Sequence, residues 1–351
     1  MKFGVCIDDV WRYMKVKPPS SIILPHILSH SLTIKRTKFN ILEKIHFPYK
    51  KVELNSIDSL AKTLSKVGIK FIRFWFQWNF IQPILSLNDS SQYEWVKMDR
   101  FINVLKQAGI ELLPIVGCGY QRMLPNGIID PSKNITEYIR RIYESTREIV
   151  GRYKNLIKIW QIENEPNWWF AHYAAGWRKG LIWFNSKFKQ ALLSSLKDAV
   201  TSEDKNAKIV INLEIDRKVK DLSFYKKYCD IIGLDYYPNY SHAKPIDVST
   251  LIPKAKNIFE ETGKQIIICE TGYPSGPSIL GYNKTLQALY IKKLQEALND
   301  DLLIKAIFIW RLSDNSEWRS FPEHENHFGL IEANGTPKPS WYAYLNWVKE
   351  F

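Results

Sequence analysis

Short apolar runs recur along the chain, each followed by a longer segment of helical character, and this alternation limits the fold more than any other feature. Strands that alternate with helices predict a parallel sheet, because the chain must cross a face of the sheet before the next parallel strand begins. Gly68, Gly109 and Gly263 each stand just before a run, where the preceding helix is expected to end. Eight runs occur, at residues 3–7, 69–76, 110–116, 157–162, 208–213, 230–234, 265–269 and 306–310.

Eight strand–helix units fill the 351 residues, which favours an α/β fold closed into a (β/α)8 (TIM) barrel. An open, doubly wound sheet would show the same alternation, but no glycine-rich nucleotide fingerprint follows any run. We therefore predict one catalytic domain over residues 1–351, with long loops at the carboxyl ends of the strands. Two connections are unusually long: an insertion at about residues 11–56 after the first run, and residues 313–330 after the last.

The composition indicates a protein with a full core. Hydrophobic residues make up 45% of the chain and charged residues 24%, and no uninterrupted apolar stretch is long enough to span a bilayer. The net charge of +13 raises nucleic-acid binding as an alternative function, yet the Lys and Arg residues are scattered rather than gathered on one face. We expect neither nucleic acid nor membrane as a partner, and the composition leaves the oligomeric state open.

The first residues look like a strand and lack the basic start, apolar middle and small-residue cleavage site of a signal peptide. The four cysteines fall in or beside apolar runs, as buried thiols of a reducing compartment do, so a cytoplasmic location is expected. Neither the cysteines nor the seven histidines form a pair at metal-ligand spacing on an expected strand, so we expect no metal and no cofactor. The cysteines are Cys6, Cys118, Cys229 and Cys269.

Two of the apolar runs end in carboxylates. Residues 157–166 read IKIWQIENEP, which places Glu165 where Pro166 ends the fourth run, and Glu270 ends the seventh run, QIIICE. A single strand-end acid is often a helix cap or the partner of a lysine. Strands four and seven, however, face each other across the mouth of such a barrel, where active sites are built. Paired carboxylates suit glycoside cleavage, since one protonates the leaving oxygen while the other attacks the anomeric carbon or activates water.

The ordered set of motifs resembles clan A of the glycoside hydrolases, with its cellulase-like, β-galactosidase, β-xylosidase and galactanase families, over nearly the whole chain. The resemblance implies a retaining β-glycosidase or endo-β-glycanase that forms a covalent glycosyl-enzyme, with Glu165 as general acid/base and Glu270 as nucleophile. The motifs are Asn164-Glu165-Pro166, Glu270, and the segments FIRF at 71–74, IGLDYYP at 232–238, FIW at 308–310, HFGL at 327–330 and KP at 338–339.

The resemblance also implies supporting roles. Arg73 and Tyr237 would keep Glu270 ionised and oriented. Asn164 would bind the sugar 2-hydroxyl, and Trp310 would lie under the sugar. Arg73 as a strand-end ion-pair partner and Trp310 as core are the plainer alternatives. Tyr236 and Tyr237 point to opposite faces of a regular strand, so only one can meet Glu270, and the motif favours Tyr237.

Three further features limit these assignments. Glu163 is a rival acid, which we interpret as a supporting group one step deeper in the barrel. Asp235 stands where cellulase-like members have a histidine, and the third run also lacks their histidine, so the sugar contacts of those families cannot be transferred. Trp168 and Trp169 begin an aromatic cluster suited either to sugar binding or to loop packing. A transglycosylase and a non-catalytic carbohydrate-binding barrel stay open, as do the sugar, the linkage and exo or endo action.

Overall fold

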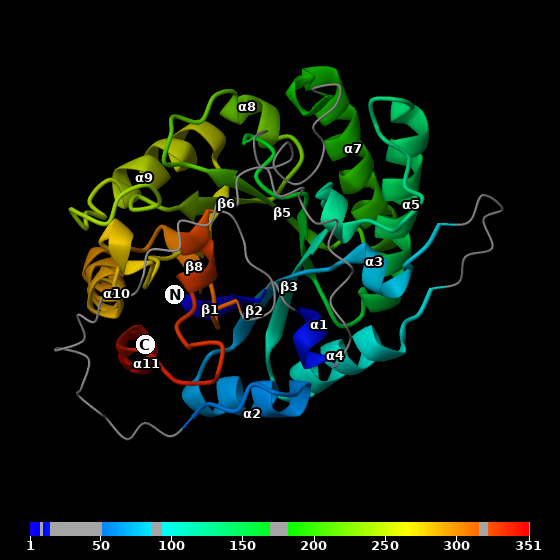
Figure 1. Ribbon diagram of the computed structural model, residues 1–351. Coiled ribbons are helices and arrows are strands. Elements are labelled where there is room, and N and C mark those ends of the chain that lie inside the picture. The colour runs from blue at the N-terminus through cyan, green and yellow to red at the C-terminus, as the bar shows by residue number, and fades with distance from the viewer. Residues whose placement is uncertain (8–9, 15–50, 86–92, 169–181, 316–321, 351) are drawn as a thin grey trace.

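Eight parallel strands close into a barrel in sequence order, which confirms the (β/α)8 prediction. The computed structural model describes residues 1–7, 10–14, 51–85, 93–168, 182–315 and 322–350. Figure 1 shows the strands as an inner ring with the helices outside it. The strands are β1 (Lys2–Ile7), β2 (Phe71–Trp75), β3 (Glu111–Val116), β4 (Ile159–Ile162), β5 (Lys208–Glu214), β6 (Ile231–Tyr236), β7 (Gln265–Thr271) and β8 (Ile304–Ile309).

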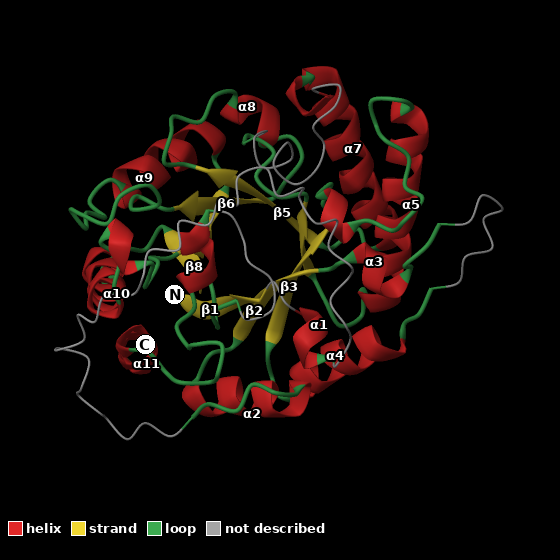
Figure 2. Cartoon of the chain, in the orientation of Figure 1, coloured by secondary structure: helices red, strands yellow, loops and turns green. Residues whose placement is uncertain are grey.

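Helices connect successive strands around the outside of the barrel (Figure 2). Three of them, α1, α3 and α8, are single turns. The helices are α1 (Val10–Tyr13), α2 (Ile57–Val67), α3 (Trp78–Ile81), α4 (Val96–Gln107), α5 (Ile135–Tyr153), α7 (Ser186–Glu203), α8 (Leu222–Tyr225), α9 (Leu251–Thr262), α10 (Lys284–Leu298) and α11 (Pro339–Lys349). Short 3-10 turns are η1 (Gln121–Met123), η2 (Ile182–Phe184), η3 (Ser278–Leu280) and η4 (Glu323–His327).

The ends of α2 show how local sequence sets an element. The Ser56 side chain accepts the N–H of Ser59 at 3.2 Å, which satisfies an amide at the amino end that has no partner within the helix. Gly68 ends the helix at a φ of 84°, in the left-handed region that glycine enters without steric cost. The prediction that this helix ends at Gly68 is therefore confirmed.

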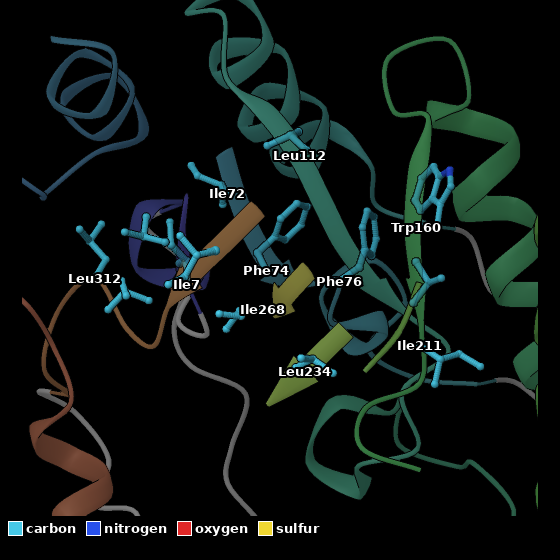
Figure 3. Close-up of a cluster of buried hydrophobic side chains, with 14 of the residues drawn as sticks. Ile7, Ile72, Phe74, Phe76, Leu112, Trp160, Ile211, Leu234, Ile268 and Leu312 are labelled. Atoms are coloured by element: carbon cyan, nitrogen blue, oxygen red, sulfur yellow. The ribbon is translucent and has the colours of Figure 1, made fainter. Parts of the chain in front are cut away.

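Alternate side chains of each strand face the helices and form the main core. Figure 3 shows Phe74, Trp160, Leu234 and Ile268 among these side chains, and each is at most 1% exposed. The remaining residues of each strand point into the barrel. The lower part of this interior is apolar, with partly buried Ile159 packed against Cys6, Phe71, Leu113, Val210, Ile231, Ile267, Cys269, Ala306 and Phe308.

Nearer the carboxyl ends of several strands, the inward-facing residues are polar instead of apolar. Arg73 follows Phe71 on β2, Asn212 follows Val210 on β5, and Asp235 lies four residues after Ile231 on β6. All three are at most 1% exposed. The upper part of the barrel is therefore a buried polar layer beneath the carboxyl ends of the strands.

Most of the predicted insertion, residues 15–50, lies outside the described residues. Its described ends include helix α1, and Val52, whose N–H donates to the Gly335 carbonyl at 2.8 Å. A position over the catalytic face, and one domain spanning residues 1–351, stay predictions. Within the described ranges, no helix is both long and apolar enough to cross a membrane.

Candidate active site

The backbone turns sharply where β4 ends. Glu163 and Glu165 have φ values of 56° and 44°, in the left-handed region where a residue with a side chain is strained by about 1–3 kcal/mol. Hydrogen bonds hold both turns. The Glu163 carboxylate accepts the N–H of Gly119 at 3.1 Å and of Asn164 at 2.8 Å, and the Glu165 N–H donates to Asn212 Oδ1 at 3.0 Å. Glu163 thus anchors the loop and Glu165 lies beyond it.

A β-bulge on β7 turns Glu270 into the barrel. Cys269 faces the interior, so its neighbour Glu270 would face the helices if the strand were regular. The register pairs Leu234 with Ile268 but Asp235 with Glu270, so one residue is skipped. A Cβ at position 233 would clash with the Cys269 Sγ, so the absence of a side chain at Gly233 makes room for the bulged strand.

Both carboxylate oxygens of Glu270 receive a donor. Arg73 Nη1 donates to Oε1 at 2.6 Å, and the Tyr237 hydroxyl donates to Oε2 at 2.8 Å. The rest of the guanidinium is also bound, since Nε donates to Gln161 Oε1 at 2.6 Å and Nη2 to Asn164 Oδ1 at 3.0 Å. Burial alone would lower the pKa of Arg73, but the charge of Glu270 raises it, so the guanidinium stays cationic. This network fixes Glu270 in one orientation.

Glu165 has the opposite electrostatic environment. Burial raises its pKa well above the ordinary value, and the negative charges of Asp235, Glu270 and Glu214 raise it further. Asp235, fully buried, also has a raised pKa, through burial first and then through Glu270. Two carboxyl groups with different environments in one site are what acid catalysis beside a nucleophile requires.

Comparisons with known proteins support the same chemistry. The sequence profile of Glycosyl hydrolase family 53 matches residues 129–290, a stretch that contains both Glu165 and Glu270. A "Thermostable celloxylanase" of Thermoclostridium stercorarium is 24% identical over 76% of this chain and 77% of its own. An "Endo-1,4-beta-xylanase B" of Thermotoga neapolitana is 24% identical over 66% and 68%.

The chain is a clan A glycoside hydrolase. It cleaves β-glycosidic bonds with retention of configuration, the mechanism general to these families, and its substrate is a carbohydrate. Its fold resembles that of a GH2 β-galacturonidase from Eisenbergiella tayi, with a TM-score of 0.57 and 16% identity over 84% of this chain. The hydrolase spans about half, 47%, of that longer chain.

The alternation along β6 separates the two tyrosines of the hydrolase. Tyr237 reaches Glu270, whereas the Tyr236 hydroxyl lies on the other face, 3.0 Å from Thr250 Oγ1. Asp235 lies two residues before Tyr237 and therefore faces the same side of the strand. In the sequence, Asp235 stands out only as a departure from the cellulase-like pattern. In the structure its charge raises the pKa of Glu165, next after burial and ahead of Glu270.

The roles of the buried amide side chains of the hydrolase were not predicted from the sequence. Gln161 Nε2 donates to Asn212 Oδ1 at 2.7 Å, and Asn212 Nδ2 donates to Asn164 Oδ1 at 2.8 Å. The signal available in the sequence was an amide residue within an otherwise apolar strand. Asn164 Nδ2 in turn donates to the Tyr120 hydroxyl at 3.1 Å and lies 3.5 Å from Glu165 Oε2. The sugar contact assigned to Asn164 stays a prediction.

The tryptophans of the hydrolase differ in position. Trp310 follows β8 and packs, partly buried, against a cluster that includes Trp75 and Tyr120, at the level of the polar layer. Trp168 is half-buried, and its backbone N–H donates to the Glu165 carbonyl at 2.8 Å. Trp169 lies outside the described residues. Among the residues that the structure describes, no group of three or more His, Cys, Asp or Glu side chains is placed to hold a metal ion.

Proposed function

We propose that Glu165 is the general acid/base and Glu270 the nucleophile of this hydrolase, and that its substrate is a β-1,4-linked xylo-oligosaccharide. The observation that carries the assignment is the contrast between the two acids. Glu270 receives Arg73 and Tyr237 on its two oxygens, which orients it for attack, whereas burial and Asp235 favour the protonated form of Glu165. The similarity to a celloxylanase and to an endo-1,4-β-xylanase supports the sugar.

In the first step, Glu165 gives its proton to the glycosidic oxygen while Glu270 attacks the anomeric carbon. The bond from that carbon to the leaving oxygen breaks and an ester to Glu270 forms. In the second step, the Glu165 carboxylate takes a proton from water, the water oxygen bonds to the anomeric carbon, and Glu270 leaves as a carboxylate. Arg73 and Tyr237 stabilise the charge of Glu270 at the beginning and end of this cycle.

A panel of aryl β-glycosides tests the proposal, with proton NMR of the sugar released first. We expect the β-xyloside to have the highest kcat/KM and the first product to be the β-anomer. Release of the α-anomer would contradict retention by this pair of acids. Turnover of another glycoside in preference to the xyloside would overturn the sugar assignment alone.

Added alcohol distinguishes hydrolysis from transfer. A hydrolase gives mainly free sugar at low acceptor concentration, whereas a transglycosylase gives mainly the alkyl glycoside. A non-catalytic carbohydrate-binding barrel would release no aglycone from any member of the panel, a result that would refute the proposal as a whole.

We also propose a cytoplasmic location, supported by the cysteines. Cys6, Cys118, Cys229 and Cys269 are all buried free thiols, as is usual in a reducing compartment. Fractionation of the source cells with an antibody to the protein tests this, and recovery outside the cytoplasmic fraction would contradict it.

A further inference from the structure

Asp235 is a buried acid that the two-step mechanism does not use. It lies on β6 two residues before Tyr237, is paired in register with Glu270 on β7, and has no exposed surface. A carboxylate in such a place is costly unless it is paired with a cation or holds a proton. The nearby cation, Arg73, already donates to Glu270.

Asn212 ties Asp235 to the acid/base. Its Nδ2 donates to Asp235 Oδ2, and its Oδ1 accepts the backbone N–H of Glu165 at 3.0 Å. One amide side chain therefore bridges the backbone of Glu165 and the carboxyl of Asp235, and the charge of Asp235 acts on Glu165. Among the described residues, Asp235 Oδ1 is buried and has no N–H or O–H donor. A proton shared with Glu165 would compensate this carboxyl group.

The charge of Arg73 is opposed by more than one neighbouring acid. Among the described groups with the largest effect on this pair, Glu270 and Glu214 are negative and Arg73 is positive. If all three central carboxyls were ionised, the site would hold two uncompensated negative charges. The groups that face the pair are Cys6 on β1, Arg73 on β2, Tyr120 after β3, Glu214 on β5, Tyr237 and Tyr240 after β6, and Cys269 and Glu270 on β7.

We propose that Asp235 is a positioning residue that shares one proton with Glu165, which keeps Glu165 a proton donor in the free enzyme and a strong base in the glycosyl-enzyme. This inference rests on the proposed role of Glu165. It differs from a dependence on Glu270 alone, because the charge of Glu270 disappears when its ester forms. The charge of Asp235 persists through both steps.

The proton balance is consistent with this role. Before the reaction, Arg73 carries one positive charge, Glu270 one negative charge, and the Glu165–Asp235 pair one negative charge with its shared proton. After that proton has gone to the leaving oxygen, the pair carries two negative charges and the Glu270 ester carries none. The total is the same in both states, and the proton taken from water restores the pair.

The pH profile of Asp235→Asn tests the proposal, measured as kcat/KM for an aryl glycoside with a poor leaving group. The amide removes a negative charge and can donate to the Glu165 carboxylate, and both effects favour deprotonation of Glu165. We expect the alkaline limb to move down by about one pH unit or more. Asp235→Glu keeps the charge and should leave the limb near its original position.

Thr271→Val is the matched structural control. Thr271 is also buried at the end of a strand, where its hydroxyl donates to the Tyr236 carbonyl at 2.8 Å, but it carries no charge. Its loss should lower thermal stability without moving the limb. An unmoved limb in Asp235→Asn would overturn the inference. If Glu165→Ala kept full turnover of the same substrate, the proposed function itself would fail instead.

Two further measurements test the proposal, one on hydrolysis of the glycosyl-enzyme and one on the protonation of the wild-type protein. With a dinitrophenyl glycoside, Asp235→Asn should accumulate more glycosyl-enzyme in intact-protein mass spectra, because a weaker base slows its hydrolysis. Wild-type accumulation would count against the role in that step. If the variant does not fold, infrared difference spectra of wild type against Glu165→Gln at neutral pH decide the question. A protonated-carboxyl band in the wild type supports the shared proton, and its absence refutes it.

Discussion

Arg73 Nη1 lies 2.6 Å from Glu270 Oε1, with 1% of the arginine side chain and 8% of the glutamate side chain exposed. Removing two charges from water costs several kcal/mol per ion, so a buried pair is weak support for stability in itself. Its value here lies in geometry. The pair holds the proposed nucleophile in one orientation.

Replacing one partner of this pair should lower the free energy of unfolding more than replacing both partners. Arg73→Met leaves a buried carboxylate without its cation, so we expect a loss of about 3–5 kcal/mol in the free energy of unfolding. The double variant Arg73→Met with Glu270→Gln should recover part of that loss, although turnover is lost in both. Urea denaturation of the single and double variants measures the coupling. Strictly additive losses would show that the two side chains are not energetically paired.

The two adjacent tyrosines should respond differently to loss of a hydroxyl. Tyr237→Phe removes the 2.8 Å hydrogen bond to Glu270, and a hydrogen bond to a charged group is worth about 1.5–3 kcal/mol. We expect kcat to fall by about 10- to 150-fold. Tyr236→Phe, whose hydroxyl lies beside Thr250, is the control and should keep its kcat. Equal losses in both variants would indicate a general packing defect.

Glu163 should behave as a structural acid. Glutamine at position 163 offers one oxygen to the amides of Gly119 and Asn164, so about 1–3 kcal/mol of stability should be lost. Turnover of a dinitrophenyl glycoside should change little, and azide should have no effect. If azide accelerated Glu163→Gln, Glu163 would replace Glu165 as the acid/base candidate.

The buried carboxyls should make stability fall as pH rises. The pKa values of Glu165 and Asp235 are raised by folding, so the folded protein binds more protons than the unfolded chain above the ordinary carboxyl pKa of about 4. Unfolding free energy is therefore lost as pH rises through this window. Asp235→Asn removes one of these groups, so the melting temperature of the variant relative to that of the wild type should increase between about pH 5 and pH 8. Calorimetry across that range measures the difference, and a gain that shrinks with pH would contradict the assignment.

The barrel was predictable because burial on both sides makes each strand a continuous apolar run, and glycines mark the helix ends before several of them. Alternation along β6 was also enough to separate Tyr236 from Tyr237. The same alternation places Asp235 beside Tyr237. Its charge was visible in the sequence, but its burial next to Glu165 depends on how three strands pack.

Other parts of the site had no sequence signal. The bulge that turns Glu270 inward arises from the register between β6 and β7, which no local pattern in QIIICET specifies. The left-handed backbone at Glu163 and Glu165 opposes the preference of residues with side chains, and distant partners such as Gly119 and Asn212 hold it. Such local conflicts are expected where function competes with regular structure.

Rescue by azide tests the assignment of the two acids most directly, with the product identified by proton NMR. Glu270→Gly should lose turnover, and azide should restore it by attacking from the vacated side to give the inverted α-glycosyl azide. Glu165→Ala should still cleave a dinitrophenyl glycoside, whose leaving group needs no proton, and azide should give the retained β-glycosyl azide. Full activity in either variant without azide, or the same azide anomer from both, would contradict the account.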